Sequence, residues 1–101
     1  MPHPVETLKS EEAKIHELVR KHRWPSDVDG YDVVFGEDST GDASVWIWFY
    51  VPDELAPPRT RITALRKFAD TIRDEILDAQ LSHYPYVRFR APPKRRASGG
   101  R

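Results

Sequence analysis

Residues 45–50 have the sequence Val-Trp-Ile-Trp-Phe-Tyr, an unbroken stretch of β-branched and aromatic side chains that is typical of a β-strand. Successive side chains of a strand point to opposite faces of its sheet. One face would then carry side chains suited to a hydrophobic core: Val45, Ile47, Phe49 and Val51. The other would carry large, partly polar rings: Trp46, Trp48 and Tyr50. A small domain can rarely cover both faces of a sheet, so the stretch predicts one buried face and one aromatic face that is free to bind.

The composition restricts the class of protein. The 101 residues suffice for one domain with a modest core. The 16 basic and 16 acidic residues cancel, so no overall positive charge attracts nucleic acid, and RNA binding would need a local patch. The absence of cysteine excludes disulfides, thiolate metal sites and a cysteine nucleophile. No apolar stretch approaches the ~20 residues of a membrane span, and no signal-peptide core is present. We therefore expect a soluble, cytoplasmic protein without a membrane partner.

The first half of the chain predicts a helix followed by a β-hairpin. Ser10, followed by two glutamates, is a favourable helix start. We expect this helix to end near Arg23, before a Trp-Pro step, with residues 1–9 as a flexible lead-in. Two alternating segments, Tyr31–Phe35 and Ala43–Val51, flank a polar turn and predict an antiparallel hairpin.

The second half predicts a long helix and a short strand. Apolar residues recur at steps of three and four from about Pro58 to Gln80, which is the strongest helical pattern in the chain. They are Ile62, Leu65, Phe68, Ala69, Ile72, Ile76 and Ala79. A last strand is expected at Tyr86–Arg90. Residues 92–101 lack side chains that could enter a core and predict a disordered basic tail, so the single domain spans residues 10–91.

Together these elements predict an α+β fold, a two-layer α-β-β-α-β sandwich with a three-stranded mixed sheet and both helices on one face. The second strand, the long helix and the third strand form a crossover, so the third strand should run parallel to the second and antiparallel to the first. Strand order 3-1-2 is our first expectation, and order 1-2-3 is the second. The helices should cover the face that carries Val33, Phe35, Val45, Ile47, Phe49, Val87 and Phe89.

The opposite face of this sheet is the candidate binding surface. Its expected members are Trp46, Trp48, Tyr50, Tyr86, Arg88 and Arg90. The arginines could lie over the rings as internal cation–π pairs, on a face that is wet or lies under the first helix. The face could instead bind a protein, either a second copy or a cognate partner, since Trp, Tyr and Arg are typical hot-spot residues. In a third interpretation, the rings stack on unpaired RNA bases while the arginines hold phosphates.

The long helix carries its charges in an unfavourable order. Four cations lie in its N-terminal half, and acids follow them. The cations are Arg59, Arg61, Arg66 and Lys67. Cations at a helix N-terminus oppose the macrodipole, so this cluster is a candidate contact for an anion or for RNA. The alternative is that Arg66 pairs with Asp70 at i,i+4 and that the other charges are simply solvated.

No pattern of residues indicates a reaction. Neither acidic loop, at 27–32 or at 37–42, has the EF-hand spacing of acids at alternate positions followed by a glycine at the sixth. The four histidines do not have the spacing of metal ligands. A phosphate-binding glycine loop, a nucleophile elbow and a paired-carboxylate motif are also missing from the sequence. We therefore expect a protein that is not an enzyme, with no cofactor, no metal and no small-molecule substrate.

Three stretches carry a resemblance to a known family: residues 43–48 (Ala-Ser-Val-Trp-Ile-Trp), 64–73 (Ala-Leu-Arg-Lys-Phe-Ala-Asp-Thr-Ile-Arg) and 84–89 (Tyr-Pro-Tyr-Val-Arg-Phe). From about residue 31 to residue 90 the layout resembles ribosome-binding factor A, a family with a KH-like arrangement. The resemblance implies a KH-like fold, and it implies RNA binding as an alternative function. The family's Ala-x-Gly break is replaced here by Asp-Ala-Gln at residues 78–80, so the fold is what we carry over.

Residues 41–46 and 84–90 are also similar to small uncharacterised bacterial proteins, some of which are encoded in two-gene toxin–antitoxin-like pairs. That similarity implies a protein partner. The main hypothesis is thus a non-catalytic interaction domain that binds a protein, either itself or a cognate partner, as an antitoxin-like accessory. The alternative hypothesis is a KH-like RNA-binding domain.

Overall fold

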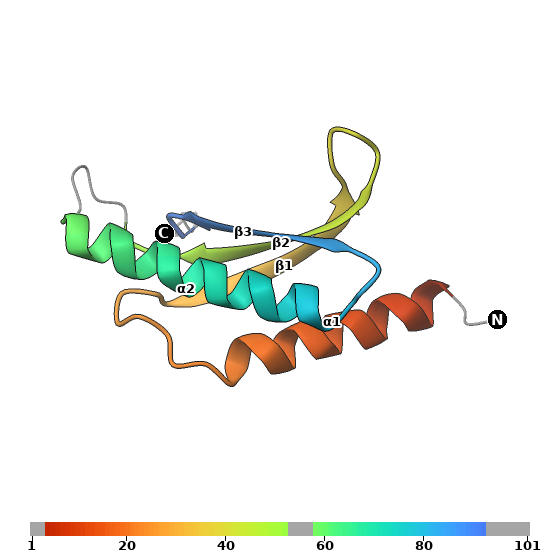
Figure 1. The fold of residues 1–101 in the computed structure, drawn as a ribbon, viewed down its shortest axis with the longest axis horizontal. Helices are drawn as coiled ribbons and strands as arrows, with labels where there is room; N and C mark the ends of the chain where they lie inside the picture. The colour runs from red at the N-terminus through yellow and green to blue at the C-terminus, as the bar shows by residue number, and fades with distance from the viewer. Residues whose placement is uncertain (1–3, 53–57, 93–101) are drawn as a thin grey trace, which may run out of the picture.

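The computed structural model describes residues 4–52 and 58–92, which form two helices and three strands (Figure 1). In chain order the elements are α1 (Pro4–Arg20), β1 (Gly30–Glu37), β2 (Ala43–Tyr50), α2 (Arg59–Asp78) and β3 (Tyr84–Arg90). The predicted α+β class and the α-β-β-α-β order are confirmed. Within the described ranges, neither helix has the length and apolar character needed to cross a membrane.

β2 is the central strand of the sheet. The order is β1-β2-β3, with β1 antiparallel and β3 parallel to β2. The predicted strand directions are confirmed, but the preferred order 3-1-2 is wrong and the second expectation is correct. The physical reason lies in β2, whose two faces are both apolar, with Ile47 and Phe49 on one and Trp46 and Trp48 on the other. The side chains on both faces of such a strand make the most cross-strand contacts when the strand is paired at both of its edges, which is the case only for a central strand.

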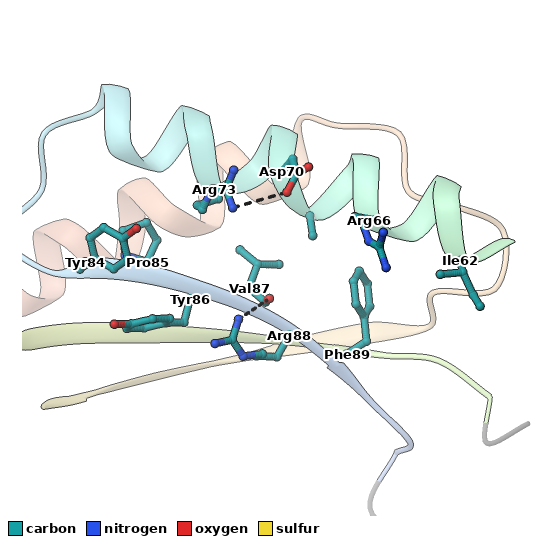
Figure 2. Close-up of a pocket in the computed structure, with 11 residues that line it drawn as sticks. Ile62, Arg66, Asp70, Arg73, Tyr84, Pro85, Tyr86, Val87, Arg88 and Phe89 are labelled. Atoms are coloured by element: carbon teal, nitrogen blue, oxygen red, sulfur yellow. Dashed lines mark hydrogen bonds and ion pairs between the residues drawn. The ribbon is translucent and has the colours of Figure 1, made fainter. Parts of the chain in front are cut away.

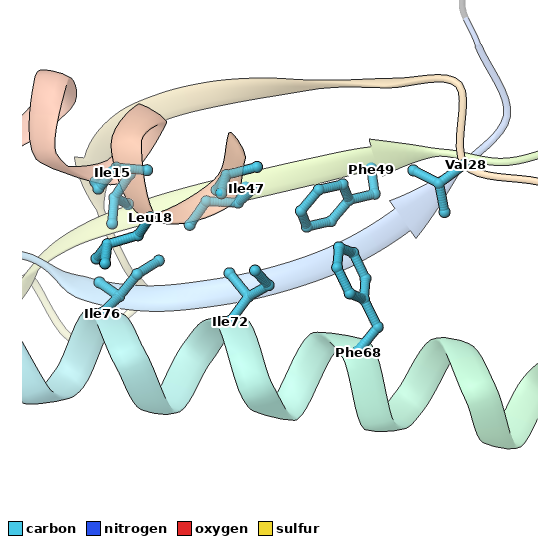
Figure 3. Packing of buried hydrophobic residues seen from close by; sticks show 10 residues of the cluster. Ile15, Leu18, Val28, Ile47, Phe49, Phe68, Ile72 and Ile76 are labelled. Atoms are coloured by element: carbon cyan, nitrogen blue, oxygen red, sulfur yellow. The ribbon is translucent and has the colours of Figure 1, made fainter. Parts of the chain in front are cut away.

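Both helices pack against one face of the sheet, which gives two layers (Figure 1). The buried core residues come mainly from α1, β2 and α2: Ile15, Leu18, Val19, Val28, Val45, Ile47, Phe49, Phe68, Ile72 and Ile76. The Phe49 ring centroid lies 4.9 Å from that of Phe68 and 6.0 Å from that of Phe89. Figure 3 shows Phe68, Ile72 and Ile76 on α2 pointing toward β2. The helical periodicity of the sequence therefore identified the core face of α2, except for Ile62, which is 40% exposed.

α1 begins earlier than predicted. Its first residue is Pro4 and not Ser10, so residues 4–9 are helical and are not a flexible lead-in. Proline is tolerated in the first turn of a helix because its missing N–H would have no intrahelical partner there. Residues 1–3 of the predicted lead-in lie outside the described residues.

The end of α1 and the C-terminal part of the chain also differ from the prediction. α1 ends at Arg20, and Trp24 donates its indole N–H to the Val19 carbonyl oxygen at 3.1 Å. This bond satisfies one of the acceptors that a helix end leaves free. β3 begins at Tyr84, earlier than predicted. Of the predicted basic tail, residues 93–101 lie outside the described residues.

Candidate interaction surface

The open face of the sheet brings the predicted binding residues together. They are Trp46, Trp48, Tyr50, Tyr86, Arg88 and Arg90, and we call them the aromatic-arginine face. β3 lies directly beside β2, so each β2 ring of this set has a β3 member of the set as its register partner. Both described helices lie on the opposite side of the sheet (Figure 1). Order 3-1-2 would have placed β1 between the two strands, so the observed order makes this surface more compact than expected.

Each arginine of the face lies over a ring. Arg90 Cζ is 4.3 Å from the ring centroid of Trp48 and 5.6 Å from that of Tyr50. Arg88 Cζ is 5.3 Å from the ring centroid of Tyr86. Contacts of this kind are worth about 0.5–1 kcal/mol each at exposed sites. The internal cation–π pairing that the sequence left open is therefore present for both arginines.

Trp46 lies against both neighbouring strands. It stacks on Tyr86 of β3, with 5.5 Å between the ring centroids and 18° between the ring planes. On the other side, a Cβ atom added to Gly36 of β1 would meet the Trp46 ring at 3.4 Å, so the glycine leaves room for the indole. Val34, the register partner of Trp46 on β1, is 47% exposed. The apolar part of the open face therefore continues onto β1.

Two aspartates bind the tyrosine hydroxyls of the face. The Tyr50 hydroxyl donates to the Asp32 carboxylate, and the Tyr86 hydroxyl donates to Asp38 at 3.1 Å. The hydroxyl and the backbone N–H of Thr40 also donate to Asp38. These hydrogen bonds, with the Thr40 hydroxyl as the main cause, lower the pKa of Asp38 to about 2. The bond to Asp38 raises the pKa of the Tyr86 phenol, so Asp38 carries a negative charge beside the rings at neutral pH.

A groove runs between β3 and α2 along the free edge of the sheet, and we call it the β3–α2 groove (Figure 2). Its volume is about 480 Å³. Its walls are formed by Ile62, Arg66, Ala69, Asp70 and Arg73 of α2 and by residues 84–89 of β3. No sequence pattern marks this groove, because only the tertiary structure fixes how the two elements lie beside each other.

The four cations of α2 do not form one patch. Arg61 faces the loop before β1, where its Nε atom lies 3.0 Å from Asp27 Oδ2. Arg66 lines the β3–α2 groove instead. The alternative pairing of Arg66 with Asp70 is not found, since Asp70 Oδ1 lies 3.5 Å from Arg73 Nη1. The other two cations are exposed: Arg59 and Lys67.

A polar cluster connects α1 to the turn before β3. Ser82 donates its N–H (2.9 Å) and its hydroxyl to Glu11 Oε2, and His83 Nδ1 lies 2.9 Å from Glu11 Oε1. The Ser82 hydroxyl also lies 3.1 Å from the same His83 nitrogen. Because the serine and the carboxylate share one ring nitrogen, the cluster lacks the geometry of a nucleophile activated by histidine. Glu11 is 71 residues away from Ser82, so no local pattern could reveal this contact.

The electrostatics of this cluster favour an ionised Glu11. Burial opposes ionisation, since Glu11 is only 8% exposed. The hydrogen bonds from Ser82 and the contact with His83 outweigh burial and lower the pKa of the Glu11 carboxyl. The cluster therefore stabilises the fold as a buried, charge-assisted contact.

Among the described residues, no group of three or more His, Cys, Asp or Glu side chains is placed to hold a metal ion. Comparison of the chain with protein-family models, curated proteins and solved structures finds no match. The resemblance to ribosome-binding factor A therefore stays a prediction. Function has to be inferred from the geometry of the aromatic-arginine face and of the β3–α2 groove.

Proposed function

We propose that this chain is a non-catalytic interaction domain that binds a protein partner through the aromatic-arginine face. The partner is a second copy of the chain or a cognate protein that it serves as an antitoxin-like accessory. One observation carries the proposal: Arg90 is held over the Trp48 ring, with its Nη2 atom 3.3 Å from the Tyr50 hydroxyl oxygen. Side chains that are already ordered lose little entropy on binding, and Trp, Tyr and Arg contribute most at protein interfaces.

The carboxylates and the ring stacking of the face favour protein over RNA. Asp32 and Asp38 accept hydrogen bonds from Tyr50 and Tyr86, so negative charge lies beside the rings, where it would repel phosphates. Trp46 is already stacked on Tyr86. Tyr86 therefore occupies one face of the Trp46 ring on which a nucleic-acid base could otherwise stack.

RNA is the second candidate because the charge of Arg88 is not compensated. Within the described part of the chain Arg88 forms no ion pair, and its guanidinium contacts the Tyr86 ring and the Val87 carbonyl oxygen. An exposed arginine beside aromatic rings is a typical contact for single-stranded RNA.

Association measurements test the main proposal. Trp46→Ala combined with Trp48→Ala should abolish association with the partner, because it removes both indoles of the face. Leu8→Ala is the matched control, since it removes an exposed apolar side chain of α1, which lies on the other side of the sheet. Light scattering over a range of concentrations measures self-association, and affinity capture with the wild-type chain and both variants as bait detects a cognate protein. Association that survives the double substitution, or that is absent in the wild type, contradicts the proposal.

Titration with single-stranded RNA separates the two candidate functions. Protein binding through apolar contacts should depend weakly on salt, whereas RNA affinity should fall steeply between about 50 and 200 mM salt, because phosphate contacts release counterions. A monomer that binds RNA tightly at the lower salt, and loses it at the higher salt and after Arg88→Ala with Arg90→Ala, would reverse the order of the two functions.

A further inference from the structure

We propose that the β3–α2 groove is a second binding site, which takes up an extended, acidic peptide segment as a fourth strand beside β3. Proteins bind such segments at exposed sheet edges through main-chain hydrogen bonds. β3 is an edge strand, and the groove runs along it below α2 (Figure 2). The groove shares Tyr86 and Arg88 with the aromatic-arginine face, but its proposed occupant does not depend on the function proposed for that face.

The hydrogen-bond pattern of the sheet leaves main-chain groups of β3 free to bind. The Val51 N–H donates to the Arg90 carbonyl oxygen at 3.0 Å. This bond shows which residues of β3 direct their main-chain groups toward β2. In a parallel pair, every second residue of a strand directs its N–H and C=O toward its neighbour, and the residues between direct theirs away. Arg90 and Arg88 therefore bond to β2. The residues that direct their main-chain groups outward are Pro85, Val87 and Phe89.

The Arg88 side chain occupies part of this edge. Its Nη1 atom lies 3.3 Å from the Val87 carbonyl oxygen, one of the acceptors that β2 does not use (Figure 2). Arginine placed in this way and Pro85, which has no N–H, protect an edge strand from unspecific pairing. The N–H of an added strand can replace the long hydrogen bond of Arg88. The released guanidinium can then pair with a carboxylate of the incoming segment.

The charges of the groove favour an acidic segment. Three arginines, Arg66, Arg73 and Arg88, line it against one carboxylate, Asp70. Asp70 is already paired with Arg73. Across residues 4–52 and 58–92, Arg66 and Arg88 form no ion pair with a carboxylate. Side chains of an added strand alternate between the two faces of the sheet, so acids on the helix side would reach Arg66 and acids on the open side would reach Arg88.

Two designed peptides test the site. Both are fluorescein-labelled and about eight residues long, which is enough to span β3. One, the Glu-Val peptide, repeats Glu-Glu-Val-Val, and the other, the Lys-Val peptide, repeats Lys-Lys-Val-Val, so that charged side chains lie on both faces of an added strand. The full chain should bind the Glu-Val peptide at least about tenfold more tightly than the Lys-Val peptide, as measured by fluorescence anisotropy. In the complex, the amide protons of Val87 and Phe89 should exchange with solvent at least about tenfold more slowly by NMR, while the amides of β1 keep their rates.

Charge reversal at Arg66 has a matched control on the same helix. Arg66→Glu should weaken binding of the Glu-Val peptide about tenfold. Lys67→Glu makes the same change in net charge at an exposed position outside the groove lining, and it should weaken binding less than about twofold because salt screens distant charges. Arg66 is not part of the aromatic-arginine face. A failure of the groove proposal can therefore be distinguished from a failure of the proposal for the aromatic-arginine face, which the Trp46→Ala, Trp48→Ala double variant tests.

Three results with the peptides and variants would overturn the proposal, and a fourth would come from an RNA competitor. The first is no binding of the Glu-Val peptide at about millimolar concentration. The second is an equal effect of Arg66→Glu and Lys67→Glu, and the third is binding without protection of the Val87 and Phe89 amides. A single-stranded RNA of similar length is titrated in parallel. If it binds more tightly than the peptide and displaces it, the groove is a polyanion site and the strand proposal is rejected.

Discussion

Two adjacent residues of β2 have different roles because side chains alternate along a strand. Phe49 is 0% exposed, and its ring contacts those of Trp24, Tyr31 and Phe68 in the core. Trp48 points to the other face, where its ring partner is the guanidinium group of Arg90. Truncating Phe49 leaves a cavity between two packed layers, whereas truncating Trp48 removes contacts at a surface.

The two truncations should therefore differ in their effect on stability. Phe49→Ala should lower the free energy of unfolding by about 3–5 kcal/mol, because the surrounding core relaxes only partly into the cavity. Trp48→Ala should lower it by about 1 kcal/mol, through the lost cation–π contact and cross-strand packing. Urea denaturation followed by circular dichroism measures both values. Equal losses would show that Trp48 is part of a buried layer, which contradicts an open aromatic-arginine face.

Among the elements, α1 depends on one buried carboxylate for its polar contact with the turn before β3. Glu11→Gln should lower the free energy of unfolding by about 1–3 kcal/mol at neutral pH, because Ser82 loses a charged acceptor and the buried amide is left partly unsatisfied. Glu17→Gln is the control, since Glu17 is exposed and pairs with Lys14 at 3.4 Å. It should change stability by less than about 0.5 kcal/mol.

The Glu11 contribution should also depend on pH. The pKa of Glu11 in the folded state lies below its ordinary value of 4.5, which applies to the unfolded chain. The stabilisation is therefore fully present above pH 4.5 and is lost as the pH falls below 4.5 through the lower, folded pKa. Urea denaturation at several pH values should show the difference between wild type and Glu11→Gln shrinking in this acidic range. A difference that stays constant with pH would contradict a charged Glu11 in the cluster.

Elements with a regular hydrophobic period could be predicted from the sequence, whereas the elements that lie beside them in the fold could not. The period of α2 and the alternation in β2 identified the core face and the aromatic-arginine face. The start of α1 was misplaced because Ser10 is a good N-cap residue, although Pro4 is also acceptable in a first turn. The crossover rule fixes the direction of β3 but not which strand it pairs with. The apolar character of both faces of β2 was the signal that indicated the strand order. No such signal exists for the Glu11 cluster, because its partners are distant in sequence.

Across the whole molecule, β3 connects the two proposed binding surfaces. Its alternate residues Tyr86, Arg88 and Arg90 belong to the aromatic-arginine face, and the residues between, Val87 and Phe89, direct their main-chain groups to the β3–α2 groove. A partner that carries an acidic extended segment next to an apolar surface could contact both at once. Binding of the partner at one surface would then raise its effective concentration at the other surface, which strengthens the complex without any new contact.

The central position of β2 makes a prediction about how the molecule opens. The amides of a central strand are bonded alternately to its two neighbours, so all of them are protected, whereas every second amide of an edge strand faces solvent and edge strands also open by local fluctuations. We expect the slowest hydrogen exchange in β2 and around Ile72 of α2, and faster exchange in β1 and β3. With order 3-1-2, β1 would be central and most protected, so residue-resolved exchange by NMR separates the two orders. If the amides of β1 exchange more slowly than those of β2, the order β1-β2-β3 is contradicted. The direct pairing of Trp46 with Tyr86, on which the aromatic-arginine face depends, would then be contradicted as well.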